Sequence, residues 1–497
     1  MTESPSQHGG FARAFTSLSL ASGVSMAANL VRGKLAALFL GPAGVGVFNQ
    51  LSLMWNLFQV GGSLGAFNGL VQHGTEALVA KDEAALHRLA STWWILLTIT
   101  SCLLAAVGSI ASATISNWLL GDHGAHANLV ILTLLSVPFA VSAQVYRALL
   151  SAARLVPQLV RAQIASDVGG AIVFAALVPV LGLVGAIIGF GTIHVLFYLV
   201  TALSVRRTLG TTYVRPAARD FRWSLVRSNL GFGASGLAMI ALSNLSVLVV
   251  SRILISHYGL EANGIFSNAW RISSVYLGAI TTTTLSYVLP TLTRSTDEGA
   301  MSRDLNPMLR FYLVVLPPLM VAIMAGGELL VWLILSSKFQ AVALLLLLFI
   351  PAELFRVLGE TMTVPLLARR RIRPFTLLYF VQASLFVGAA VVLVPKYGTP
   401  GAVIAYMIST STGCLLDYIV ANRVTGFRLE GQTAALFASS IALLAGSSFA
   451  CFELQTLPAR SLACFGLGLL WLGINMASGE FRRMVSRGLG SLRLAGR

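Results

Sequence analysis

The chain has 497 residues, of which 56% are hydrophobic and only 10% charged, and its mean hydropathy is +0.81. This composition excludes an ordinary soluble domain and predicts an integral membrane protein. A net charge of +16 also suits a nucleic-acid-binding protein, so the distribution of the basic residues along the chain decides between these two classes.

Apolar stretches recur along the whole chain, each at least about 20 residues long, the length that a helix needs to cross the hydrocarbon core. The first is too long for a signal-peptide core and no cleavage site follows it, so we expect it to be retained. The predicted fold is therefore an all-α polytopic membrane protein with fourteen transmembrane helices. They cover residues 13–40, 46–72, 91–120, 127–149, 156–180, 183–205, 228–256, 263–291, 307–335, 341–367, 374–395, 400–422, 432–452 and 461–479.

The 34 Lys and Arg residues follow the positive-inside rule if the N-terminus is cytoplasmic. On that topology 26 lie in or beside cytoplasmic segments, five lie inside spans, and only Lys338, Lys396 and Arg460 lie in external loops. Both termini are then cytoplasmic, and the basicity reflects topology. We therefore expect no nucleic-acid partner.

Two sequence echoes indicate an internal duplication. The run "KLAALFLGPAGVGVFNQ" from Lys34 returns as "RILISHYGLEANGIFSN" from Arg252, and "LVPVLGLVGAII" from Leu177 returns as "LVPKYGTPGAVI" from Leu393. The repeated unit is six helices, so the two copies form a parallel repeat of two lobes. The predicted parts are an N-terminal lobe at 1–205, a basic cytoplasmic linker at 206–227, a C-terminal lobe at 228–424, and two extra helices with a basic tail at 425–497.

Ionisable residues inside membrane spans are costly and usually face a cavity or a partner. In the first span Arg32 continues a polar stripe that includes Ser25 and Asn29 on one helical face. Lys34 lies about 200° round the helix from Arg32, yet Lys34 is the residue that the repeat matches to Arg252. Either cation could therefore line a cavity.

Polar residues also recur at helical spacing in the second and eighth spans. The second span carries Asn49, Asn56 and Gln59, and the eighth carries Asn268 and Arg271. Such seams either bind a polar substrate or hold helices together.

The acidic residues inside spans are candidates for binding a coupling ion. Glu353, Arg356 and Glu360 share one helical face and are expected to neutralise one another. Asp167 and Asp417 have no cation at helical spacing, so each could be a proton or sodium relay or could pair with a residue of another helix.

Other kinds of site have little support. The four cysteines lie singly in predicted spans, without CxxC pairs or Cys/His spacing, so neither a disulfide framework nor a metal site is expected. The stretch "GFGASG" at residues 231–236 opens a membrane helix and follows no strand, which argues against a dinucleotide site. With no nucleotide-binding motif, we expect no cofactor, and coupling to protons, sodium or the membrane potential instead.

The run "KLAALFLGPAGVG", its copy at Arg252, and the "P-x-x-G-x-x-G-A" junctions at Pro179 and Pro395 resemble polysaccharide transporters of the multidrug/oligosaccharidyl-lipid/polysaccharide exporter superfamily. Within it the chain is similar to the Wzx-type flippases that move lipid-linked oligosaccharides for O-antigen, enterobacterial common antigen or exopolysaccharides. The resemblance implies a MATE-like pair of six-helix lobes in the bacterial inner membrane, working by alternating access. The implied partners are undecaprenyl-diphosphate-linked oligosaccharide, the lipid bilayer, and a polysaccharide polymerase with its export machinery.

The intramembrane residues fit this implied substrate, because cations bind phosphates and amides bind glycan hydroxyls. We expect substrate contacts from the cations and amides of the polar spans, and ion coupling from the four acids. The substrate set is Arg32, Lys34, Arg252, Arg271, Asn49, Asn56, Gln59 and Asn268, and the coupling set is Asp167, Asp417, Glu353 and Glu360. The main alternative is a MATE-like small-molecule or multidrug antiporter. A membrane enzyme and a non-transporting scaffold are further alternatives, but the chain has no soluble catalytic domain and a scaffold would need no buried cations.

Overall fold

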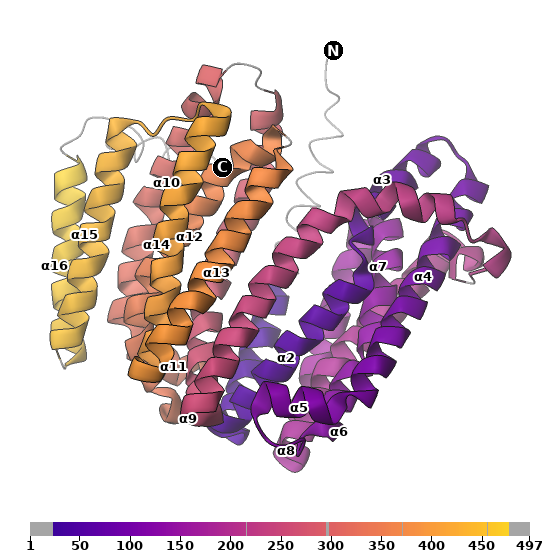
Figure 1. Ribbon diagram of the computed structural model, residues 1–497, viewed down its shortest axis with the longest axis horizontal. Helices are drawn as coiled ribbons and strands as arrows, with labels where there is room; N and C mark the ends of the chain where they lie inside the picture. The colour runs from indigo at the N-terminus through magenta and orange to yellow at the C-terminus, as the bar shows by residue number, and fades with distance from the viewer. Residues whose placement is uncertain (1–22, 215, 295–297, 370, 455, 477–497) are drawn as a thin grey trace, which may run out of the picture. The chain divides into compact units, whose positions relative to one another are not determined.

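The computed structural model describes residues 23–214, 216–294, 298–369, 371–454 and 456–476. In this part of the chain the structure consists of helices and short connections, with no strand (Figure 1). Ten of its helices are long and apolar enough to cross a membrane. The protein is therefore a multi-pass, all-helical membrane protein, as its composition predicts. The basic C-terminal tail and the first ten residues of the first predicted span lie outside the described residues.

Contacts divide the chain into two compact units. Unit 1 comprises the described residues of Met1–Gly264 together with Ile334–Lys338. Its helices are an opening segment at 23–39, α2 (Gly41–Ser63), α3 (Ala66–Val79), α4 (Glu83–Ile110), α5 (Ser112–Leu120), α6 (Ala127–Leu134), α7 (Val137–Ala152), α8 (Val156–Thr208), the 3-10 helices η1 (Thr211–Val214) and η2 (Ala218–Asp220), and the first part of α9 (Trp223–Arg294).

Unit 2 comprises Ile265–Leu333 and the described residues from Phe339 onward. Its helices are the rest of α9, α10 (Glu298–Ala325), α11 (Gly327–Ile334), α12 (Ala341–Ala368), α13 (Ile372–Tyr397), α14 (Thr399–Thr425), α15 (Gly431–Glu453) and α16 (Leu457–Met476); the 3-10 turn η3 (Ser337–Phe339) follows α11. The fourteen predicted segments fall on helix wherever the structure describes them, apart from short breaks. The number of membrane crossings and the lobe boundaries at the basic linker remain predictions.

Glycines interrupt the longest helices. The helical geometry of α8 breaks at Gly182, whose φ is 55°, and the two halves fold back on each other. A Cβ on Gly189 would stand 2.7 Å from the Cα of Phe174, so the second half packs directly on the first. Glycine permits both the left-handed backbone at the turn and the close approach after it. The predicted spans 156–180 and 183–205 thus form one hairpin.

Matched positions of the two sequence repeats share the same turn conformation. Gly41 and Gly259 both have positive φ, of 66° and 80°, and so do Gly182 and Gly398, of 55° and 63°. Only glycine adopts these conformations without strain at such angles. The duplication inferred from sequence therefore extends to the backbone geometry of the helix turns.

The basic linker between α8 and α9 is held against the start of α4. The hydroxyl of Thr92 donates to the carbonyl oxygen of Asp220 at 3.3 Å and accepts from the backbone N–H of Arg222 at 3.1 Å. His87 also lies 3.1 Å from the carboxylate of Asp220. Part of the linker is therefore an ordered piece of unit 1.

Candidate functional site

A polar cluster in unit 1 forms around Asp167 of α8. Its carboxylate accepts hydrogen bonds from Ser25 of the opening helix and from the amide of Gln163, the latter at 2.7 Å. The guanidinium of Arg32 lies 4.0 Å from the same carboxylate and donates to the amide oxygen of Asn29 at 2.6 Å. The stripe predicted on the first span thus faces α8, and we call these five residues the Asp167 cluster.

The structure gives Asp167 a partner on another helix. Asp167 pairs with a cation of another helix, since Arg32 lies on the opening helix. The carboxylate from α8 therefore supplies a counter-charge to Arg32, one of the predicted substrate residues.

A second polar cluster lies in unit 2 around Arg356 of α12. Its guanidinium donates to Glu353 and to Glu360, at 2.7 Å in each case. Tyr406 of α14 donates its hydroxyl proton to the other oxygen of Glu353 at 2.9 Å. The predicted acid-base-acid group therefore forms, and Glu353 is buried with both oxygens engaged. We call these four residues the Arg356 cluster.

Asp417 of α14 is paired with an amide rather than with a cation. Gln382 of α13 donates to both carboxylate oxygens at 3.1 Å. The pair is held between two glycines: a Cβ on Gly359 would stand 2.6 Å from an oxygen of Asp417, and one on Gly413 would stand 2.8 Å from the Gln382 side chain. Asp417 is 3% exposed, so its carboxyl group is enclosed. Any side chain larger than hydrogen at position 359 of α12 would displace this group.

An aromatic group beside the Arg356 cluster was not anticipated from sequence. The ring of Trp270 on α9 lies 4.7 Å from that of Tyr406 and stacks at 5.9 Å on Phe386 of α13. Trp270 precedes the predicted site residue Arg271. Aromatic residues at helical spacing are common in membrane helices, so only tertiary packing distinguishes this group.

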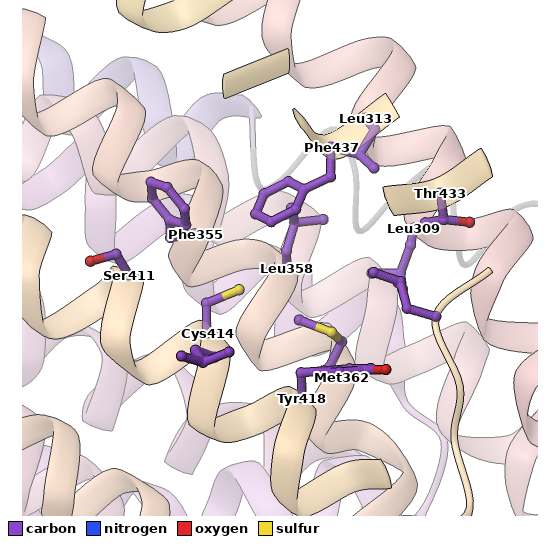
Figure 2. A pocket seen from close by; sticks show the side chains of 12 residues that line it. Leu309, Leu313, Phe355, Leu358, Met362, Ser411, Cys414, Tyr418, Thr433 and Phe437 are labelled. Atoms are coloured by element: carbon purple, nitrogen blue, oxygen red, sulfur yellow. The ribbon is translucent and has the colours of Figure 1, made fainter. Parts of the chain in front are cut away.

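An apolar cavity of about 310 Å³ lies in unit 2 among α10, α12, α14 and α15. Figure 2 shows side chains of these helices gathered around it. The lining is almost wholly apolar and consists of Leu309, Leu313, Phe355, Leu358, Met362, Ser411, Cys414, Leu415, Tyr418, Leu429, Thr433 and Phe437. Cavities of this size and composition suit apolar ligand groups.

The remaining predicted substrate residues are spread over several helices. Asn268 is buried, whereas the others are half-buried: Lys34, Asn49, Asn56, Gln59, Arg252 and Arg271. Arg252 lies at the turn after α5, where a Cβ on Gly121 would be 3.3 Å from its guanidinium. Ser52 and Ser63, on the same helix as Asn49, Asn56 and Gln59, donate to carbonyl oxygens of that helix, so these hydroxyls serve local structure.

The described residues contain no group of three His, Cys, Asp or Glu side chains placed to hold a metal ion. His194 of α8 stacks on Trp55 of α2 with ring centroids 4.0 Å apart, so this imidazole packs as an aromatic ring.

Comparison of sequences gives a consistent family assignment. The profile of the family described as "Polysaccharide biosynthesis protein" matches residues 35–344. The lipid III flippase of Escherichia coli (strain K12) is 25% identical over 393 residues, covering 77% of this chain and 91% of the flippase. The lipid III flippase of Shigella flexneri matches equally. These relatives are named as flippases and not as enzymes.

Comparison of structures confirms the MATE-like fold. The lipid II flippase MurJ, in an inward closed conformation, has a TM-score of 0.71 at 15% identity, over 92% of this chain and 98% of MurJ. An inward-facing multidrug resistance MATE family transporter of the MOP superfamily has a TM-score of 0.65 at 16% identity, over 86% of this chain and 99% of the transporter. At such identities the likeness establishes the fold alone. Because the family profile covers more than half of the 497 residues, the chain belongs to the polysaccharide biosynthesis protein family.

Proposed function

We propose that the protein is a flippase that moves undecaprenyl-diphosphate-linked oligosaccharide repeat units from the cytoplasmic to the periplasmic leaflet for surface or exopolysaccharide assembly. Family membership and the match to 91% of the length of a lipid III flippase support this function. The protein would reside in the bacterial inner membrane with both termini in the cytoplasm. It would supply a polysaccharide polymerase and the export machinery.

The arrangement of residues around α12 is the geometric observation that supports this proposal. Glu353, Arg356 and Glu360 form the polar cluster on one face, whereas the residues two positions further on, Phe355, Leu358 and Met362, line the apolar cavity. A shift of two residues is about 200° round a helix. This helix therefore borders both a charged and an apolar environment, which an amphiphile with an ionic head group and a hydrocarbon tail requires.

The proposed substrate residues would bind the head group in two ways, through charge and through hydrogen bonds. The guanidinium and ammonium groups of Arg32, Lys34, Arg252 and Arg271 would bind the diphosphate, because hydrogen bonds from cations to phosphate are strong. The amides of Asn49, Asn56, Gln59 and Asn268 would bind sugar hydroxyls. Asp167 would hold Arg32 in place until the substrate phosphate competes for it.

The acids would reset the lobes after each cycle. We favour Asp167 and Asp417 as the groups that bind a proton or sodium ion. Glu353 and Glu360 are each bound to the guanidinium of Arg356 at 2.7 Å, whereas Asp167 lies 4.0 Å from that of Arg32 and Asp417 binds an amide. The membrane potential is the other candidate, since an inside-negative potential drives an anion outward.

Reconstitution tests the function directly. Proteoliposomes containing the purified protein should translocate a fluorescent polyprenyl-diphosphate oligosaccharide, measured by protection from a quencher that cannot cross the membrane. A neutral polyprenyl glycoside serves as the control for the diphosphate, and a cationic dye tests the drug-antiporter alternative. Transport of the dye without movement of the lipid would overturn the proposal.

A further inference from the structure

Two of the four cysteines meet between the last two helices of the described chain. Cys451 lies near the end of α15 and Cys464 lies two turns into α16, and their sulfur atoms are 3.4 Å apart. Both side chains are buried, at 1% and 2% exposure. Each cysteine lies singly in its own helix, as the sequence indicates, but the α15–α16 turn brings together these two residues 13 positions apart.

We propose that Cys451 and Cys464 are joined by a disulfide bond in the assembled protein. A disulfide needs its sulfur atoms about 2.05 Å apart, so the two Sγ atoms must approach by little more than an ångström. The turn between α15 and α16 faces the periplasm in the proposed orientation. The bond thus rests on that orientation, since disulfides persist in the oxidising periplasm and not in the cytoplasm.

The chemistry is an ordinary thiol–disulfide exchange with a periplasmic disulfide oxidoreductase. One cysteine thiolate attacks the disulfide of the oxidoreductase and forms a mixed disulfide, releasing the first thiol of that protein. The second cysteine thiolate then attacks the mixed disulfide, forms the bond between Cys451 and Cys464, and releases the second thiol. The two cysteines lose two electrons and two protons, which the oxidoreductase disulfide gains.

The burial of the pair fixes when the bond can form. An oxidoreductase cannot reach side chains that are 1% and 2% exposed in the packed hairpin, so the exchange would precede the docking of α16 on α15. For the same reason the finished bond should resist reductants while the protein is folded. The disulfide would therefore be a permanent covalent link between α15 and α16.

A covalent link at this position fits the other contacts that hold α16 against its neighbours. Its outer face is apolar and exposed, with Leu462, Phe465 and Leu470 pointing away from the protein, and in lipid no hydrophobic force drives such a helix onto its neighbours. Specific contacts must hold it instead. Towards its C-terminal end, Trp471 and Asn475 donate to the hydroxyl of Ser439 on α15, at 3.2 and 3.4 Å.

The opposite end of α16 has an ionic contact. Arg460 pairs with Glu328 of α11 and donates to the carbonyl oxygen of Leu454 in the turn. A disulfide one turn further along would fasten this end covalently. Figure 1 shows α15 and α16 side by side over most of their length, so the two attachment points would hold a whole hairpin.

Thiol counting in the full-length protein tests the bond. Membranes are dissolved in SDS with a maleimide–polyethylene glycol, with or without prior reduction, and the number of attached polymers is read on a gel. We expect two labels without reductant, at Cys102 and Cys414, and four after reduction. Peptide mapping of the unreduced sample should recover the Cys451 and Cys464 peptides as one linked species.

Two sets of variants complete the test. Cys451→Ser and Cys464→Ser should each give three labels without reductant, whereas Cys102→Ser should keep the reductant-dependent gain of two. Four labels on the unreduced wild type would overturn the proposal. A separate Thr456→Cys variant, made with Cys451 and Cys464 changed to Ser, reports by labelling with an impermeant reagent whether the turn is periplasmic. It distinguishes a wrong orientation from a pair that stays reduced on the outer side.

Discussion

Gly46 of α2 and Gly264 of α9 meet backbone to backbone. A Cβ on Gly46 would stand 3.1 Å from the backbone nitrogen of Gly264 and 2.2 Å from the carbonyl oxygen of Leu260. Asn263 donates its side-chain N–H to the carbonyl oxygen of Gly46 at 3.1 Å. The two glycines are equivalent positions of the sequence repeat, so the same small residue in both copies makes a single close contact between them.

Replacing either glycine should therefore destabilise the protein. Gly46→Ala and Gly264→Ala each force a methyl group against backbone atoms, and overpacking of this kind costs roughly 1 to 3 kcal/mol. The melting temperature of the purified protein in detergent should fall by several degrees. Gly61→Ala in the same helix is the matched control, since its Cβ meets only a leucine methyl at 3.7 Å. Equal melting temperatures for Gly46→Ala and Gly61→Ala would contradict the close contact.

The proposed substrate cations should be required for transport. Lys34→Ala, Arg252→Ala and Arg271→Ala should each abolish flipping in proteoliposomes while the protein still inserts and purifies. Lys34→Arg keeps the charge with a different geometry and should retain more activity than Lys34→Ala. Lys338→Ala removes an exposed cation outside the predicted spans and serves as the control. Normal flipping by all three neutral variants would make these cations structural.

Asp417 should be needed for coupling more than for folding. Asp417→Asn can keep one hydrogen bond with Gln382 in the space between Gly359 and Gly413, so the variant should fold. It should lose the response of flipping to imposed proton or sodium gradients. Glu430→Gln, which removes the acid paired with Arg310, is the control. If flipping by Asp417→Asn still followed the gradients, or if wild-type flipping followed only an imposed potential, Asp417 would have no coupling role.

Both termini should be cytoplasmic. This prediction follows from the 26 cytoplasmic and three external Lys and Arg residues of the proposed topology. A periplasm-active reporter fused after Arg497 should be inactive, and the same reporter fused after Lys396 should be active. An active fusion at Arg497 would show that the orientation is the opposite of the one proposed, and that the α15–α16 turn lies on the cytoplasmic side.

The turn after α5 should lose stability in acid. Burial raises the pKa of Asp122, but hydrogen bonds from Ser116, from His126 and from backbone N–H groups outweigh it, so the pKa lies below its ordinary value. The stabilisation is then complete above the ordinary pKa of about 4 and disappears as the pH falls through the lowered value. The melting temperature of Asp122→Asn should be lower than that of the wild type near neutral pH, and the gap should close in acid. A gap independent of pH would refute this assignment.

The sequence by itself determined the class of the protein and much of its architecture. The length of the apolar runs alone indicates membrane helices, because about 20 apolar residues are what a helix needs to cross the hydrocarbon core. The two echoes identified the duplication, and the structure adds that matched glycines of the two copies share a positive φ. The spacing of Glu353, Arg356 and Glu360 likewise fixed their mutual contacts, because residues three and four apart share a helical face.

Tertiary structure decided which helices face one another. Helical spacing placed Ser25, Asn29 and Arg32 on one stripe, but only the packing of α8 brought Asp167 to it. The partner of Asp417 is an amide on α13 and the partner of Cys451 is a thiol on α16, and neither is visible in the spacing of its own helix. The physical reason is that the 3.6-residue period fixes neighbours along one helix, whereas contacts between helices depend on rotation and depth in the packed bundle.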